Sequence, residues 1–273
     1  MMRILQRITV LIFAVVLCLF VLFAWKEQVN ADDSWPEVLL ETPELEVGIQ
    51  LSTQELLAGV TAQDEKDGDL TDKILIESIS PFLEKGVSKI TYAVCDSDNH
   101  VAKAQRLVHF QNYTSPKFYL KQPLVFSTSD KVNIRELIGA VDCMEGDISS
   151  QITVVGTDYM PPKEGTFTLS IQVTNQLGDL SHLSIPIVVE DLDKRAPKIA
   201  LTDALIYVEQ NHPVDFASKV AGVTLQEMPV TEYTTEIVTD FNPSVAGTYA
   251  VHYYVTAANG AEGHTVLTVV VEE

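Results

Sequence analysis

A strand pattern that occurs three times constrains the fold of this chain more than any other feature. A glycine opens each copy, and apolar residues follow it at the fourth, sixth and eighth positions. The copies begin at Gly86, Gly165 and Gly247, about 80 residues apart. Alternate residues share one face of a β-strand, so each copy predicts a strand with one buried face. Repetition at a near-constant spacing indicates tandem copies of one small β-unit.

The segments around this strand predict a complete β-rich repeat. Each copy opens with an extended, proline-containing segment and closes with an apolar run, and a turn rich in Asp, Asn and Gly precedes that run. Such turns join antiparallel strands, so the last two strands of each repeat are predicted to form a hairpin. After residue 31 the helical signals are short, and residues 53–58 and 133–138 could each form one turn. The fold is therefore predicted to be all-β, with one sandwich of about seven strands per repeat. A single core shared by all strands is disfavoured, because each repeat carries its own alternating strands.

These patterns divide the chain into four parts. Residues 1–31 are predicted to be a membrane anchor or signal segment. The first, second and third repeats occupy residues 32–113, 114–194 and 195–273. The junctions between repeats are short and contain a proline, which restricts the residue before it. We therefore expect neighbouring repeats to be strung end to end, with little room to fold back.

Two motifs in the first repeat carry a specific family resemblance. Residues 58–71 read AGVTAQDEKDGDLT, and residues 86–96 read GVSKITYAVCD. Together they resemble the bacterial immunoglobulin-like domain first described in pesticidal crystal proteins, which is common in tandem on Gram-positive cell surfaces. The match is partial in the second repeat, at residues 139–149, and in the third repeat only residues 221–224 and the glycine-led strand survive. The resemblance implies seven-stranded immunoglobulin-like sandwiches without catalytic residues, used as spacer or adhesion modules.

The N-terminus predicts where the repeats reside. Arg3 and Arg7 precede the apolar run Ile8–Trp25, in which Thr9 is the polar residue. A helix of this length spans roughly 27 Å, close to the ~30 Å hydrocarbon thickness of a bilayer. Arginines on the N-terminal side place that end in the cytoplasm and the repeats outside. A signal peptide cleaved after Ala31 stays open as the alternative, and it would make the protein secreted.

The net charge limits which partners the protein can bind, and the positions of the cysteines indicate whether disulfides are expected. The net charge of −20 excludes nucleic acid as a partner and suits a soluble exposed surface. Cys18 lies in the apolar run, whereas Cys95 and Cys143 fall at unrelated positions of different repeats. No disulfide framework that repeats with the domain is therefore predicted.

Two acidic clusters could bind calcium. The first is the turn of the first repeat, with Asp64, Asp67, Asp69 and Asp72. It is not an EF-hand, because Lys66 and Gly68 occupy positions that need oxygen ligands. The second is the junction segment 190–193, which reads EDLD. A calcium site at either cluster stays open, but a tight Asp-Gly turn explains the first without metal, and no metal-binding residue is assigned.

The remaining polar residues give no signature of catalysis. The six histidines are scattered, and His252 and His264 could face each other across the final hairpin, which is too few ligands for zinc. No Gly-x-Ser-x-Gly turn, Ser-x-x-Lys pattern or phosphate-binding loop occurs. Trp35 is expected to be a linker or interfacial residue. Core or strand-face positions are expected for three further aromatic residues, Tyr92, Phe167 and Tyr253. We predict neither an enzyme nor a cofactor nor a small-molecule substrate.

Two functions fit this sequence. The first is a surface protein whose repeats form a stalk or an adhesion module, held to the membrane by the N-terminal helix and binding a protein or glycan. The second is an accessory carbohydrate-binding protein acting on wall or host glycans. The third repeat departs most from the repeat pattern at residues 225–235. A binding surface is therefore expected there first.

Overall fold

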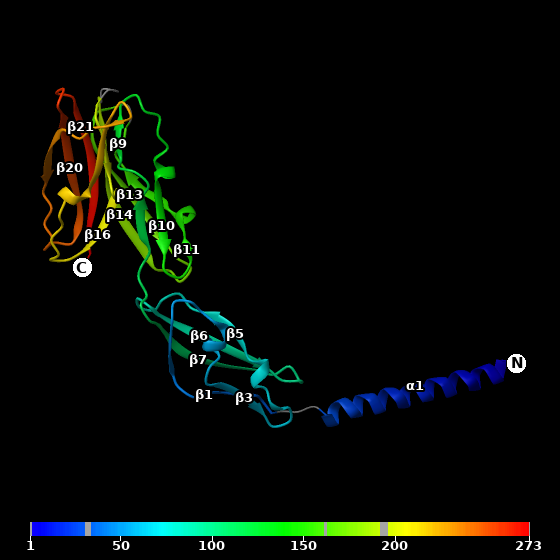
Figure 1. The fold of residues 1–273 in the computed structure, drawn as a ribbon. Helices are drawn as coiled ribbons and strands as arrows, with labels where there is room; N and C mark the ends of the chain where they lie inside the picture. Colours follow the sequence, from blue (N-terminus) through cyan, green and yellow to red (C-terminus); the bar gives the residue numbers. More distant parts are fainter. Residues whose placement is uncertain (1, 31–33, 161–162, 192–195, 273) are drawn as a thin grey trace. The chain divides into compact units, whose positions relative to one another are not determined.

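The structure, a computed structural model, describes residues 2–30, 34–160, 163–191 and 196–272. One long helix precedes a series of β-sheets (Figure 1). Contacts within the chain define two compact units. The first unit contains the N-terminal helix and the first repeat, apart from residues 84–86, and the second unit contains the second and third repeats.

The N-terminal helix α1 runs from Met2 to Asn30. Its stretch from Gln6 to Lys26 has a mean hydropathy of 3.0, and none of it is buried against the rest of the described chain. This helix is long and apolar enough to cross a membrane, as predicted, although a signal sequence has the same properties. Ala31, the expected cleavage position, lies outside the described residues.

Each repeat contains a three-stranded and a four-stranded sheet. In the first repeat the sheet orders are β1-β3-β4 and β2-β7-β6-β5. The elements of this repeat are β1 (Glu37–Leu40), β2 (Glu44–Val47), α2 (Thr53–Leu56), β3 (Val60–Asp64), β4 (Gly68–Asp69), η1 (Thr71–Lys73), β5 (Leu75–Ile79), β6 (Val87–Cys95) and β7 (Val101–Phe110).

The second and third repeats have the same sheet orders. These are β11-β10-β8 with β12-β13-β14-β9, and β15-β17-β18 with β16-β21-β20-β19. The second repeat consists of β8 (Lys117–Leu120), β9 (Val125–Ser127), η2 (Ile134–Leu137), β10 (Ile138–Asp142), β11 (Gly146–Asp147), η3 (Ser149–Gln151), β12 (Thr153–Thr157), β13 (Gly165–Thr174) and β14 (Leu180–Glu190). The third consists of β15 (Lys198–Leu201), β16 (Leu205–Glu209), η4 (Ala217–Lys219), β17 (Val220–Leu225), β18 (Met228–Pro229), β19 (Tyr233–Thr239), β20 (Gly247–Ala257) and β21 (Glu262–Glu272). The sequence repeat is thus a repeated pair of sheets, which fits tandem β-sandwiches.

The local predictions about strands are confirmed. The hairpins β6–β7, β13–β14 and β20–β21 are antiparallel. The nine residues at the fourth, sixth and eighth positions after the glycines are all buried: Ile90, Tyr92, Val94, Leu169, Ile171, Val173, Val251, Tyr253 and Val255. Residues 53–56 and 134–137 form single helical turns, also as predicted. A feature that the pattern did not predict is the parallel pairing of each repeat's second strand with its last strand.

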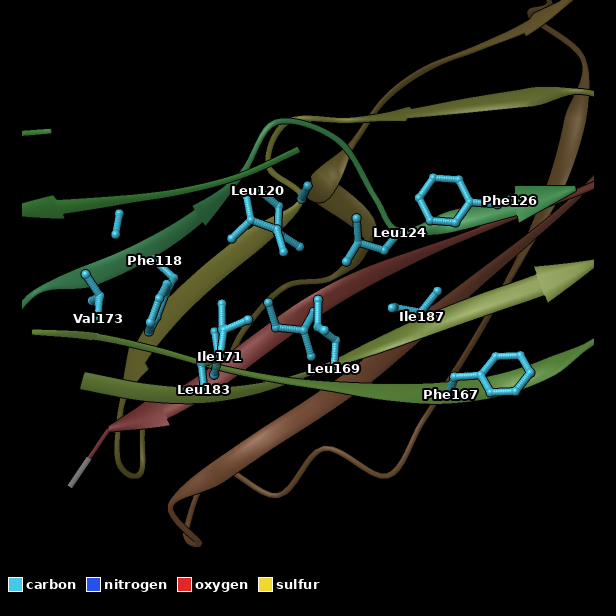
Figure 2. Packing of buried hydrophobic residues seen from close by; sticks show 14 of the residues in the cluster. Phe118, Leu120, Leu124, Phe126, Phe167, Leu169, Ile171, Val173, Leu183 and Ile187 are labelled. Atoms are coloured by element: carbon cyan, nitrogen blue, oxygen red, sulfur yellow. The ribbon is translucent and has the colours of Figure 1, made fainter. Parts of the chain in front are cut away.

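The buried residues of the second repeat form one continuous cluster (Figure 2). Leu169, Ile171 and Val173 project from β13 into this cluster. Phe118 and Leu120 from β8, in the three-stranded sheet, and Leu124, just before β9, complete it. The cluster also includes Ala204 from the third repeat. The core of the second repeat is therefore closed in part by its neighbour.

Within the second unit, the second and third repeats lie side by side (Figure 1). Leu205 and Val270 of the third repeat pack against the core of the second. The N–H of Phe118 on the edge strand β8 donates a hydrogen bond to the Tyr207 hydroxyl, at 2.8 Å. The expected end-to-end arrangement is therefore wrong for this pair. The physical reason is that the outer face of β21 carries Val266 and Val270, so it gains stability by burial against the second repeat.

Candidate functional site

The candidate site lies in the second unit, where side chains of the second and third repeats meet. Glu190 is the last residue of β14, and His264 lies near the start of β21. The Nδ1 atom of His264 is 2.6 Å from Oε1 of Glu190, and the His264 side chain is only 5% exposed. The fold thus joins one residue from the acidic junction to one of the two histidines that the sequence singled out.

Two further rings extend this contact along the outer face of the final hairpin. Nδ1 of His252 lies 3.0 Å from Nε2 of His264, and the two ring planes are 6° apart. Tyr254, the cross-strand partner of His264, stacks on it with ring centroids 4.4 Å apart. The prediction that His252 and His264 face each other is confirmed. We call His252, Tyr254 and His264 the imidazole stack.

Burial controls the charge of this stack. Burial lowers the pKa of His264 and His252 lowers it further, whereas Glu190 acts in the opposite direction. His264 therefore favours its neutral form near pH 7, and one imidazole of the pair can donate the hydrogen bond that the other accepts. Among the residues that the structure describes, no group of three or more His, Cys, Asp or Glu side chains is arranged to hold a metal ion.

Two grooves flank the imidazole stack. The first, of about 610 Å³, is lined by His264, Phe126 and Pro197 together with polar residues of both repeats. The second, of about 730 Å³, is lined by His252, Tyr249 and five hydroxyl side chains, Thr166, Thr168, Ser184, Thr239 and Thr248. We call this second groove the hydroxyl groove. Both volumes fall within the range of ligand pockets, roughly 300–1,000 Å³.

Three aspartates of the acidic turn in the first repeat accept hydrogen bonds from backbone N–H groups. Oδ1 of Asp64 accepts the N–H groups of Lys66 and Asp67, each at 2.9 Å. Asp67 accepts the backbone N–H and the hydroxyl of Ser97, and the backbone hydrogen bond is the main cause of its lowered pKa. Asp69 accepts from the N–H of Thr71, and Asp72 is exposed on η1. Asp64 and Asp69 thus act as turn-stabilising acceptors, and Asp67 links this turn to Ser97.

An aspartate stabilises the corresponding turn of the second repeat in the same way as Asp64 does in the first. Asp142 accepts the N–H groups of Met144 and Glu145, at 2.8 and 3.0 Å. Its other oxygen accepts a hydrogen bond from the buried Asn175 side chain, at 3.0 Å. The Asp-Gly motif is therefore explained by turn geometry in both repeats. Of the junction cluster, Asp193 lies outside the described residues.

The divergent segment of the third repeat forms a hairpin between β17 and β18. At its tip Gln226 and Glu227 have φ angles of +52° and +68°, which cost non-glycine residues energy. The neighbouring Met228 is 72% exposed. In the first repeat, Trp35 is 65% exposed and stacks on His100 with ring centroids 4.9 Å apart. The β17–β18 hairpin belongs to the three-stranded sheet of the third repeat, whereas the imidazole stack lies on β20 and β21 of the four-stranded sheet.

Sequence reasoning missed the residues that hold the second and third repeats together. Besides its hydrogen bond, the Tyr207 ring lies under the Lys117 ammonium at 4.7 Å, and Lys117 pairs with Glu272 at 2.7 Å. The signal for this interface was present in residues 265–271, which read TVLTVVV. A nearly continuous β-branched run, rather than alternation, is typical of a strand buried on both faces.

Comparisons with known proteins do not assign a family. No family model and no curated protein matches the sequence. A solved structure of the M60 catalytic domain with CBM51-1 and CBM51-2 from Clostridium perfringens ZmpB is similar at 10% identity and a TM-score of 0.26, over 82% of this chain and 37% of that one. The CBM51-2 and INT domains of the same protein, in complex with GlcNAc, are similar at 12% identity and a TM-score of 0.23, over 87% and 42%. The protocadherin GammaB4 extracellular domain is similar at 12% identity and a TM-score of 0.21, over 89% and 50%.

The present chain spans half or less of the length of each of these structures. TM-scores this low carry no conclusion about function. The resemblance to the immunoglobulin-like family of pesticidal crystal proteins therefore depends on the motifs of residues 58–71 and 86–96 alone.

Proposed function

We propose that this chain is a non-enzymatic, membrane-anchored protein that displays three immunoglobulin-like sandwiches outside the membrane as an adhesion or protein-interaction module. Each seven-stranded sandwich corresponds to one repeat, with the bounds 32–113, 114–194 and 195–273. The anchor is α1, whose stretch Gln6–Lys26 is not buried against any other part of the described chain. Arg3 and Arg7 give the orientation, with the repeats on the outer side.

The observation that carries the binding function is the hydroxyl groove at the seam between the second and third repeats. The groove exists because the two repeats pack laterally, and its walls come from both. One wall includes residues of β19, the edge strand of its sheet. An edge strand offers backbone N–H and C=O groups to an added strand, so an extended protein segment suits this site.

A carbohydrate ligand is the second candidate. The hydroxyl groove combines the rings of Tyr249 and His252 with hydroxyl groups that can exchange hydrogen bonds with a sugar. This combination favours a glycan over a purely apolar ligand.

The test is a binding screen with the full chain in lipid nanodiscs against arrays of matrix proteins and of glycans. The variant Thr248→Arg places a long charged side chain in the groove, and Thr256→Arg, on the same strand outside the groove lining, is its matched control. We expect a ligand on the protein array whose binding is lost in Thr248→Arg and retained in Thr256→Arg. A ligand found only among glycans, with the same variant pattern, would favour the second candidate. Binding that is indifferent to Thr248→Arg, or no ligand on either array, would contradict the proposal.

A further inference from the structure

The sixth position after the strand-opening glycine differs in the second repeat. Tyr92 and Tyr253 occupy it in the first and third repeats, and both are fully buried. Their hydroxyls donate hydrogen bonds to backbone carbonyls, Tyr92 to Leu56 at 2.6 Å and Tyr253 to Phe216 at 3.0 Å. Leu56 ends α2, and Phe216 directly precedes η4. In these two repeats a phenol ring thus fills the core and ties the short helical turn to the strand.

The second repeat has Ile171 at this position, which carries no hydroxyl and a smaller side chain. The neighbouring strand differs as well. In the first repeat the buried Arg106 donates to the Tyr92 hydroxyl and to the Leu56 carbonyl. Strand register places Ile185 at the equivalent position of the second repeat, since Arg106 pairs with Ile90 and Ile185 pairs with Leu169. Both groups that fasten the helical turn in the first repeat are therefore replaced by isoleucine.

A hollow of about 480 Å³ lies beside the first of these two positions, since Ile171 lines it and Ile185 does not. It is bounded on one side by Ile134 of η2 and on the other by Leu169 and Ile171 of β13. Figure 2 shows both β13 side chains on the strand face that points into the core. Ile152 and Tyr159 line it further and are half-buried, so the hollow opens to the surface.

We propose that this hollow is a binding site for a single phenol ring supplied from outside the chain. The protein itself provides the template, because two of its three repeats place a phenol ring between the equivalent strand and helical turn. The walls are largely apolar, and Asn133, Ser150 and Thr157 at the rim can accommodate one hydroxyl group. An apolar cavity of about 150 Å³ suffices to hold benzene, so the volume is ample for one ring.

The test is a titration of 4-fluorophenol, followed by ¹⁹F NMR, into the full chain in lipid nanodiscs, with empty nanodiscs subtracted. We expect saturable binding to the wild-type chain. The variant Ile171→Tyr restores the internal ring and should bind at least about tenfold more weakly, a difference of 1.4 kcal/mol or more. The matched control is Ile185→Val, which alters a buried core residue outside the lining and should bind like wild type.

A second variant keeps the test decisive if Ile171→Tyr does not fold. Ile152→Trp blocks the hollow from its half-buried rim and should also abolish binding. Absence of saturable binding to the wild type, or equal binding to a folded blocking variant, would overturn the proposal. Competition with an end-blocked Gly-Tyr-Gly peptide identifies the source of the ring. Displacement of the probe assigns it to a tyrosine of a peptide or protein, and no displacement assigns it to a free phenol.

Discussion

The hydroxyl of Tyr207 should be a measurable link between the second and third repeats. It accepts the hydrogen bond of the Phe118 N–H at 2.8 Å. Strand β8, which contains Phe118, is the edge of its sheet, so this N–H has no neighbouring strand on that side. Burial raises the pKa of Tyr207 to about 12, and the hydroxyl therefore stays protonated at every pH of interest.

The substitution Tyr207→Phe removes this acceptor alone, because phenylalanine keeps a ring beneath Lys117. Leaving a buried donor unpaired costs about 1–3 kcal/mol, and the partly buried position of this bond favours the lower half of that range. For a cooperative unit of this size each kcal/mol lowers the melting temperature by about 2–4 °C. We therefore expect a decrease of about 2–8 °C in the transition that includes both repeats.

The assay is differential scanning calorimetry of the full chain in nanodiscs. The matched control is Tyr119→Phe, since the Tyr119 hydroxyl makes no hydrogen bond to any residue that the structure describes. A melting temperature of Tyr207→Phe equal to that of the control would refute the reasoning about the edge strand. Separate transitions for the second and third repeats, with the decrease confined to one of them, would refute the single cooperative unit.

Three further predictions concern His264, the close approach at Gly263 and the turn aspartates. Because burial holds the pKa of His264 below its ordinary value, the unfolded chain binds more protons than the native chain near pH 6. The melting temperature should therefore fall from pH 7 to pH 5, and less so in His264→Gln. In Gly263→Ala the new Cβ would lie 2.0 Å from the Pro197 carbonyl oxygen, and this clash should lower the free energy of unfolding by about 1–3 kcal/mol. The control is Gly222→Ala, whose new Cβ would have no atom within 4 Å and should not clash. Melting temperatures in EDTA and in millimolar calcium should agree, because the turn aspartates already accept backbone hydrogen bonds, and a clear rise with calcium would contradict this.

The sequence predicted those parts of the fold that depend on local patterns. The buried alternation after Gly86, Gly165 and Gly247 and the three terminal hairpins needed only strand periodicity and turn composition. The parallel pairing of β2 with β7 was not predicted, because it joins segments distant in sequence and leaves no turn motif between them. The proline at the junction near residue 197 restricted one backbone angle but did not set the direction of the next repeat.

The candidate site was predicted only in pieces. Glu190 and the histidine pair were each singled out, but their meeting depends on the lateral packing of two repeats. The run at residues 265–271 could have indicated that packing, because a strand with one solvent-exposed face alternates and this one does not. The hollow beside Ile171 could also have been found by aligning the repeats, since tyrosine occupies the equivalent position twice.

The most direct test of the central claim, that the repeats lie outside the membrane, uses the chain's own cysteines. Cys95 is free and exposed in the first repeat, whereas Cys143 is only partly exposed. A membrane-impermeant maleimide added to intact cells that produce the protein should label Cys95, and Cys95→Ser should lose most of that label. Retention of the labelled chain in the membrane fraction at full length would identify α1 as an anchor, and a shorter labelled chain in the medium would identify a cleaved signal. Labelling that requires lysis of the cells would contradict the claim.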